Sequence, residues 1–304
     1  MLLMLMGRFI SIFVSVDTPS TAKQMCTSVN DEHIYCLMNY IDDKFEQLAI
    51  RHEQTISDTI EEKLEELNSC DSEQRPVNCQ DIYMQGNINS GIYSVFFPDC
   101  VETSTGRICQ SSVSAIRVYC DMENENGGPG WIVFQRRQDV SVLFAHDWNT
   151  YKHGFGDLDG ELWFGNDNIA KITVSGNFRL RIDLGDWEGE HRYAEYSFIR
   201  VLGEEDKYRL FFGDYSGDAG DALISQNGAY FSTIDHDNDG LPRTHCALNH
   251  WNASFWFSSC GNVRLNNPYH VGGTAIGGKG TSWYSWHGWY SLKLTTMKAR
   301  PVLT

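Results

Sequence analysis

The chain has 304 residues, of which 41% are hydrophobic and 13% are aromatic, a composition typical of globular proteins. Its formal net charge of −16 argues against nucleic acid or anionic membranes as main partners, and it suits an extracellular protein that binds cations. Nine cysteines without any Cys-x-x-Cys pair indicate disulfides formed in an oxidising compartment rather than a zinc site. The odd count leaves at least one thiol free or available for an intermolecular bridge.

The N-terminal stretch is almost continuously apolar over residues 1–16, interrupted by Arg8. It is too short for a comfortable transmembrane span, and small residues at Ser20 and Ala22 suit signal-peptide cleavage. We therefore expect residues 1–22 to be a signal peptide and the protein to be secreted. An anchored or truncated N-terminus is the alternative, because the usual basic start of a signal is missing.

Residues 23–76 are expected to form a helical oligomerisation segment that ends in a hinge at residues 71–76. Residues 30–70 contain no Gly or Pro. Apolar residues there alternate steps of four and three, a heptad pattern that shifts once: Ile34, Met38, Ile41, Phe45, Leu48, then Ile56, Ile60, Leu64 and Leu67. This pattern favours a short coiled coil, with a single amphipathic helix packed on the globular part as the alternative. The cysteines placed to bridge parallel chains are Cys26, Cys36 and Cys70.

Beyond Pro76 the chain changes to short β-prone runs separated by Gly-rich turns. The runs predict strands at residues 91–95, 116–120, 131–135, 178–184, 196–201 and 208–212. Helical patches are short, as at residues 147–151. Because there is no βαβ alternation and no repeat, we expect residues 77–304 to form one α+β domain rich in loops.

An acidic loop over residues 231–246 places Asp235, Asp237 and Asp239 at alternate positions before Gly240. Such spacing can turn several oxygens toward one point, as Ca²⁺ requires. The loop is not an EF-hand, because the twelfth position from Asp235, which should be Glu, is Cys246. A different Ca²⁺ loop and a solvated Asp/Asn turn both remain open.

A set of motifs in the same order resembles a fibrinogen C-terminal (fibrinogen-related) domain over residues 79–302, roughly three quarters of the chain. The motifs lie at residues 79–81, 90–93, 118–122, 130–137, 148–156, 160–166, 231–233, 290–293 and 297–301. The resemblance implies a twisted, mainly antiparallel sheet, short helices and a loop-rich C-terminal subdomain that binds Ca²⁺. Here a helical coiled coil is expected to precede this domain.

The resemblance also implies how cysteines and a metal are arranged. It pairs Cys79 with Cys120 and Cys246 with Cys260, and the two cysteines of an insertion, Cys100 and Cys109, are expected to pair with each other. A structural Ca²⁺ is expected to be held by the carboxylates of Asp237 and Asp239, with water and backbone carbonyls. Those carbonyls are expected among Leu241, Pro242, Arg243 and Thr244.

In the lectin branch of this family, ficolins and tachylectins, an acetyl-binding pocket lies beside the Ca²⁺ loop. The resemblance implies a cis peptide between Ser259 and Cys260. This sequence has Gly261 where the pocket usually has His, and Gly277 where it usually has Tyr, which weakens simple acetyl recognition. The residues that map onto the pocket are His250, Trp256, Phe257, Ser259, Cys260, Tyr269 and Trp289.

The first functional hypothesis is a secreted, Ca²⁺-dependent lectin-like protein of innate-immune type, assembled as a disulfide-linked homo-oligomer. It would bind carbohydrate or acetylated ligands on cell surfaces, with sugar rings on Trp faces, unless these Trp residues belong to the core. The alternative is a ligand for a protein receptor or a matrix component, resembling angiopoietin-like or tenascin-type proteins. An enzyme is not expected, because nucleophile-elbow, zinc-protease and P-loop motifs are missing. Asn252 begins the one clear N-glycosylation sequon.

Overall fold

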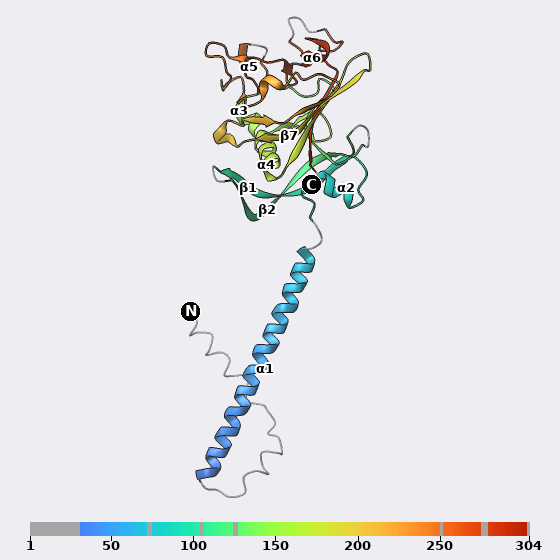
Figure 1. The fold of residues 1–304 in the computed structure, drawn as a ribbon. Coiled ribbons are helices and arrows are strands. Elements are labelled where there is room, and N and C mark those ends of the chain that lie inside the picture. The colour runs from blue at the N-terminus through green and yellow to red at the C-terminus, as the bar shows by residue number, and fades with distance from the viewer. Residues whose placement is uncertain are drawn as a thin grey trace. The chain divides into compact units, whose positions relative to one another are not determined.

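The structure is a computed structural model, and it describes residues 31–71, 75–103, 106–123, 127–249, 252–274 and 279–302. The chain divides into two compact units, Met1–Gln74 and Arg75–Thr304. The first unit contains α1 (Asp31–Asp71), the blue helix of Figure 1. Among the described helices, none is both long and apolar enough to cross a membrane.

Helix α1 confirms the predicted helical segment. Its residues include no Gly or Pro, the two residue types that most disfavour a helix interior. Several large apolar side chains on it are exposed, including Ile41 (42%), Phe45 (66%) and Ile60 (54%). The coiled coil itself stays a prediction. The expected signal peptide and Cys26 lie outside the described residues, as do the side chains of Cys36 and Cys70.

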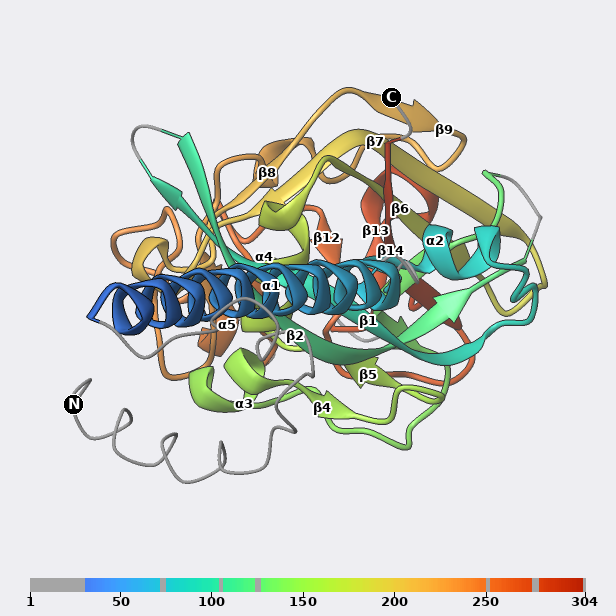
Figure 2. The ribbon, with the colours of Figure 1, turned by 90° about the horizontal axis from the view of Figure 1, so that it is seen from below.

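The second unit is built on a ten-stranded antiparallel sheet whose central order is β1-β2-β3-β14-β6-β7-β8, with β4, β5 and β9 paired to its members. In this sheet β6 lies between β14 and β7 (Figure 2). The strands are β1 (Gly91–Thr103), β2 (Gly106–Asp121), β3 (Trp131–Arg137), β4 (Phe155–Gly156), β5 (Leu162–Trp163), β6 (Phe178–Gly185), β7 (His191–Val201), β8 (Leu210–Phe212), β9 (Tyr215–Gly217) and β14 (Leu294–Pro301). Each predicted strand overlaps one of these, although residues 208 and 209 precede β8.

The period of two along the strands separates an apolar face from a charged one. In β6, Leu180 and Ile182 are fully buried, whereas the alternate residues Arg181 and Asp183 belong to an ion-pair network. Lys298 of β14 joins this network through a 2.7 Å contact to Asp183. The sheet therefore has a dry core on one side and paired charges on the other.

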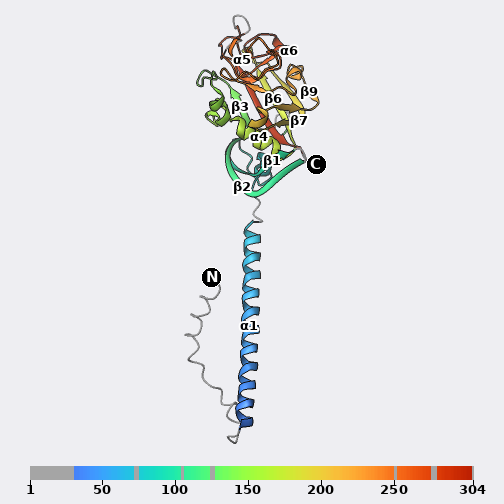
Figure 3. The ribbon, with the colours of Figure 1, turned by 90° about the vertical axis from the view of Figure 1, so that its left-hand side faces the viewer.

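The helices are short and cover the apolar face or the ends of the sheet. They are α2 (Cys79–Met84), α3 (Trp148–His153), α4 (Asn166–Ser175), α5 (Cys246–Asn249) and α6 (Tyr284–His287), with 3₁₀ turns η3 (Glu204–Asp206) and η4 (Ile224–Gln226). α4 packs against β1 and β7. Figures 1 and 3 show α5 and α6 together at one end of the domain, with β1 and β2 at the other.

Two small ribbons support the end that carries α5 and α6. One pairs β10 (Phe231–Ser232) with β11 (Phe255–Trp256), and the other pairs β12 (Val263–Arg264) with β13 (Ser282–Trp283). These ribbons are too short to be stable alone, so the loops between them depend on side-chain contacts and a disulfide. The candidate site lies in these loops.

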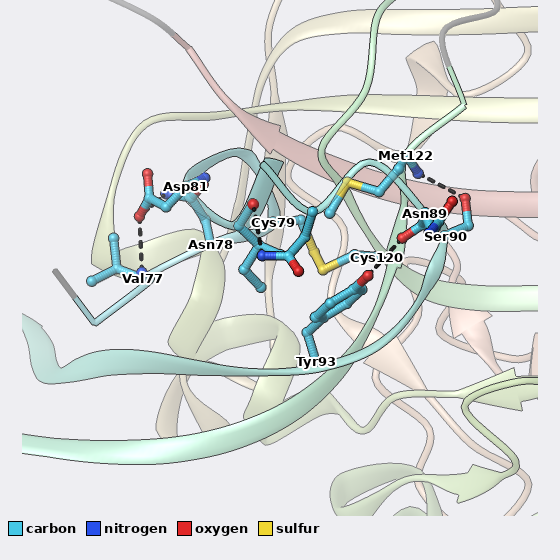
Figure 4. The surroundings of a disulfide bond; sticks show 11 residues. Val77, Asn78, Cys79, Asp81, Asn89, Ser90, Tyr93, Cys120 and Met122 are labelled. Atoms are coloured by element: carbon cyan, nitrogen blue, oxygen red, sulfur yellow. Dashed lines mark hydrogen bonds between the residues drawn. A yellow bond between two sulfur atoms is a disulfide. The ribbon is translucent and has the colours of Figure 1, made fainter. Parts of the chain in front are cut away.

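The disulfide between Cys79 and Cys120 fastens α2 to the end of β2, and both cysteines are fully buried (Figure 4). Asn78 caps α2 by accepting a 3.0 Å hydrogen bond from the backbone N–H of Asp81. Figure 4 also shows Ser90 accepting from the N–H of Met122. The β1–β2 register sets the backbone of Cys100 opposite Cys109, and their disulfide stays a prediction because their side chains lie outside the described residues.

Candidate functional site

The acidic loop is closed by the carboxylate of Asp239. Its Oδ1 accepts a hydrogen bond from the N–H of Leu241 and its Oδ2 accepts one from the N–H of Cys246, both at 2.7 Å. Because Cys246 is bonded to Cys260, this carboxylate fixes the loop to the disulfide. Asp239 therefore has a structural role in the loop that needs no metal.

Asp235 joins the other side of the loop to α3. Its Oδ1 accepts hydrogen bonds from the N–H of Trp148 at 2.9 Å and the hydroxyl of Thr233 at 2.7 Å. Desolvation alone would raise the pKa of Asp235, but these hydrogen bonds outweigh it and hold the pKa below its ordinary value. The ring of His236 stacks on that of Trp148, with centroids 5.0 Å apart.

Asp237 is exposed, and its only hydrogen bond is a 3.4 Å contact from the N–H of Asp239 among the described residues. Ca²⁺ prefers oxygen ligands, and a carboxylate oxygen that accepts one N–H retains a second lone pair. Asp237 and Asp239 thus fit the ion in kind. In the described ranges, no group of three or more His, Cys, Asp or Glu side chains gathers around a possible metal position.

Residues 258–262 form the segment that faces the acidic loop. The N–H of Gly240 donates to the carbonyl of Ser258 at 2.7 Å, and a Cβ at position 240 would lie 2.2 Å from that oxygen. Only glycine fits this close approach. The exposed Ser259 and the partly exposed Cys260 are therefore held against the loop, and their role in ligand binding stays a prediction.

The peptide between Ser259 and Cys260 is trans, so the cis bond expected from the resemblance is wrong. The chain turns here through two residues of positive φ, Cys260 and Gly261, each at 58°. Non-proline cis bonds cost about 3 kcal/mol and need surroundings that enforce them. The left-handed conformation at these two positions makes the turn instead.

An exposed aromatic pair lies on the other side of this segment. Tyr284 (47% exposed) and Trp289 (37% exposed) have ring centroids 4.7 Å apart, and the N–H of Tyr284 donates to the carbonyl of Asn262 at 3.0 Å. The guanidinium of Arg264 lies 3.5 Å from the centroid of Trp289. Burial lowers the pKa of Arg264, and the ring face stabilises its charge.

Two of the predicted ligand-binding residues belong to the core. Trp256 has no exposed surface, and its indole N–H donates to the carbonyl of Tyr208 at 2.7 Å. Phe257 is 4% exposed. Their assignment to an exposed pocket is therefore wrong. Trp256 pairs with Phe231 in the β10–β11 ribbon, and Phe257, which directly follows β11, is also buried.

The hydroxyl of Tyr269 contacts two backbone carbonyls outside the 258–262 segment. It lies 3.0 Å from the carbonyl of Gln138 and 2.9 Å from that of Lys293, so it fastens two loops beside β3 and β14. His250 and Gly277 lie outside the described residues. Asn252 is exposed and has a positive φ of 55°, a conformation that Asn tolerates.

A buried carboxylate, that of Asp186, contacts the last residue of the helix that begins at Tyr284. Asp186 is 4% exposed and accepts hydrogen bonds from the N–H groups of Glu188 and Glu190 and from Nε2 of His287. Desolvation opposes ionisation, but these donors outweigh it and lower the pKa of Asp186. His287 ends α6, so Asp186 fixes the helix that carries Tyr284.

Three residues of this surface were missed in the sequence: Tyr284, Arg264 and Gln226 of η4. Arg264 belongs to β12, and Tyr284 directly follows β13. The short β-prone runs in the sequence could have suggested this ribbon and so both residues. Gln226 reaches the segment from 35 positions upstream of Gly261, and no sequence pattern indicates that contact.

The family model described as "Fibrinogen beta and gamma chains, C-terminal globular domain" matches residues 75–302. The chain belongs to this family. It is 41% identical to ryncolin-4 of Cerberus rynchops over 226 residues, covering 74% of this chain and 61% of that protein. It is 40% identical to fibrinogen C domain-containing protein 1-A of Xenopus laevis over 241 residues, covering 76% of this chain and 49% of that protein. The chain thus spans about half to three fifths of the length of these relatives.

Solved structures share the fold. The fibrinogen-like globe domain of human ANGPTL2 superposes with a TM-score of 0.66 at 34% identity, covering 74% of this chain and 99% of that domain. Lamprey fibrin D-dimer, complexed with the peptide Gly-His-Arg-Pro-amide, superposes with a TM-score of 0.63 at 31% identity, covering 89% of this chain and 92% of that chain. These likenesses confirm the predicted family and fold class.

Proposed function

We propose that this fibrinogen-related domain is an extracellular recognition module that binds carbohydrate beside its acidic loop. The observation that carries the proposal is the exposed pair of rings, Tyr284 and Trp289, which the N–H of Tyr284 joins to the 258–262 segment. Sugar rings present apolar C–H faces that pack on aromatic rings, while main-chain groups bind their hydroxyls. Positive-φ Cys260 and Gly261 supply such a main chain.

Calcium is part of the proposal. Asp237 and Asp239 would hold the ion together with backbone carbonyls and water, and the ion would neutralise two carboxylates that lie close together. The hydrogen bonds that already orient Asp239 mean that little loop entropy remains to be lost on binding. The ion would stiffen the surface and take no part in chemistry.

Oligomerisation through α1 would raise the avidity of a weak site. The exposed apolar side chains of α1 suit a second copy of this helix, and Cys26, Cys36 and Cys70 would covalently link the chains. A homo-oligomer would present several recognition surfaces to one cell surface.

A protein receptor is the second candidate, and a specific observation favours it. Arg264 stacked on Trp289, with Tyr284 alongside, combines the three residue types that most often dominate protein interfaces. The lamprey fibrin D-dimer, which shares this fold, forms a complex with a peptide ligand.

A glycan array probed with the full chain, in Ca²⁺ and in EDTA, tests the first candidate. Binding that free sugar competes, and that Trp289→Ala abolishes, would support it. Phe198→Ala is the matched control, because Phe198 has a similar exposed fraction (44%, against 37% for Trp289) but belongs to strand β7. If the chain binds no glycan on the array but binds a receptor ectodomain saturably, the second candidate is supported and the first is rejected.

A further inference from the structure

The carboxamide of Gln226 occupies the place of a side chain at position 261. A Cβ built on Gly261 would lie 1.9 Å from Nε2 of Gln226, which is far inside van der Waals contact. Gln226 has no exposed surface, so its carboxamide lies wholly inside the fold beneath position 261. A side chain at position 261 would therefore require this carboxamide to move, and the φ of 58° at Gly261 also disfavours one.

One end of this carboxamide is paired and the other is not. Oε1 accepts a 3.0 Å hydrogen bond from the hydroxyl of Ser225, whereas Nε2 has no hydrogen-bond partner within the described part of the chain. Leaving a buried donor unpaired costs free energy, so the amide weakens the fold rather than supporting it. The hydroxyl of Ser258, at the start of the facing segment, is buried without a partner in the same way.

A second buried glutamine shows what a structural role requires. Gln135 is likewise fully buried, and its Nε2 lies within 3.3 Å of three acceptors, which are the Leu265 carbonyl, the Asn266 side chain and the Thr295 hydroxyl. The two residues have the same side chain and the same burial but differ in whether the amide is satisfied. The hydrogen bonds of Gln135 account for a buried glutamine at that position, because they stabilise the fold. The amide N–H groups of Gln226 make no such bonds within the described residues, so stability does not account for a buried glutamine there.

We propose that Gln226 is a specificity-determining residue of the recognition surface, a role that rests on the proposed carbohydrate-binding function. It occupies the place of a side chain at position 261 and donates its unpaired N–H to an oxygen acceptor of the ligand. The carboxamide is covered in the free chain, so binding includes a turn about its last torsion, which is soft for a glutamine. The ligand class is a sugar that presents a hydroxyl or ring oxygen over Gly261.

The test compares Gln226→Met with Gln135→Met in the full chain, by thermal unfolding and on an array that carries sugars with and without N-acetyl groups. Gln226→Met should bind the best wild-type sugar about tenfold more weakly, the worth of one such hydrogen bond. Its Tm should equal or exceed that of the wild type, because an unpaired buried donor has been removed. Gln135→Met should lower the Tm by about 3 °C or more. Gln226→Glu, which keeps the shape and replaces the donor by an acceptor, should also lose binding.

The outcomes distinguish failure of the role proposed for Gln226 from failure of the proposed carbohydrate-binding function. A wild-type chain that binds no sugar overturns the proposed function, and the inference with it. Sugar binding that both Gln226 variants retain overturns the inference alone. A fall in Tm for Gln226→Met as large as that for Gln135→Met would make Gln226 a structural residue and would also overturn it.

Discussion

The Oδ2 atom of Asp239 accepts a 2.7 Å hydrogen bond from the backbone N–H of Cys246, which in turn is bonded to Cys260. A carboxylate proposed to bind Ca²⁺ is thereby joined through two steps to the segment proposed to contact ligand. If Ca²⁺ binds as proposed, this link would couple occupancy of the metal site to the shape of the recognition surface.

Asp237 and Asp239 should respond differently to mutation. Asp239→Ala should lower the Tm even in EDTA, because two hydrogen bonds worth about 1 kcal/mol each are lost. Asp237→Ala should leave the Tm in EDTA unchanged and should abolish the stabilisation by Ca²⁺. Thermal unfolding with Ca²⁺ and with EDTA measures both effects. If the Tm of the wild type is the same in Ca²⁺ and in EDTA, the proposal that this loop binds Ca²⁺ is wrong.

Trp256→Ala and Trp289→Ala should separate stability from recognition. Removing the fully buried Trp256 should cost about 3–5 kcal/mol, as for other large-to-small changes in a core. Removing Trp289 should cost much less and should weaken ligand binding. Urea denaturation gives the first quantity and glycan-array signal the second. Equal losses of stability would place Trp289 in the core as well.

The disulfide between Cys246 and Cys260 closes a short loop, with a sequence separation of 14. Replacing both cysteines by Ala should cost about 3 kcal/mol, because the unfolded chain regains loop freedom. The same double change at Cys79 and Cys120 should cost slightly more, since that separation is 41. Only the first pair should also alter ligand binding, and an equal effect of both on binding would mean that global unfolding is responsible.

Helix α1 should determine the oligomeric state. Ile41→Ser with Phe45→Ser should convert the reduced protein to monomer, because both side chains are exposed in the single helix. Asp43→Ser, also at an exposed position of α1, is the control and should leave the state unchanged. Light scattering after size exclusion measures the mass. A wild type that is monomeric with and without reductant would refute assembly through α1.

Acidification should destabilise the domain partly through Asp186. Its pKa is lower in the folded chain than in the unfolded chain, so its contribution is complete above the ordinary aspartate pKa and is lost as pH falls through the folded value. Asp186→Asn should therefore lower the free energy of unfolding at pH 7 by about 1 kcal/mol, and this difference should shrink as pH falls below the ordinary aspartate pKa. Parallel curves over this range would show that Asp186 does not titrate in the folding reaction.

Local patterns in the sequence were enough for the regular elements. The Gly- and Pro-free run predicted α1. The β-prone segments at residues 131–135 and 178–184 predicted β3 and β6, because β-branched and aromatic residues favour strands. Trp256 shows where such reasoning ends. Its neighbours in sequence resemble a binding motif, but pairing between β10 and β11 turns the ring into the core.

The sequence by itself determined the family, the fold class and the acidic loop, because these depend on residue types at short spacings. The tertiary structure decided which rings are exposed, how Asp239 reaches Cys246, and which residue fills the space above Gly261. Gln226 lies 35 positions away from Gly261, and their contact exists only because η4 and the 258–262 segment pack together. Contacts of that kind are set by the packing of distant elements, for which a single sequence carries no periodic signal.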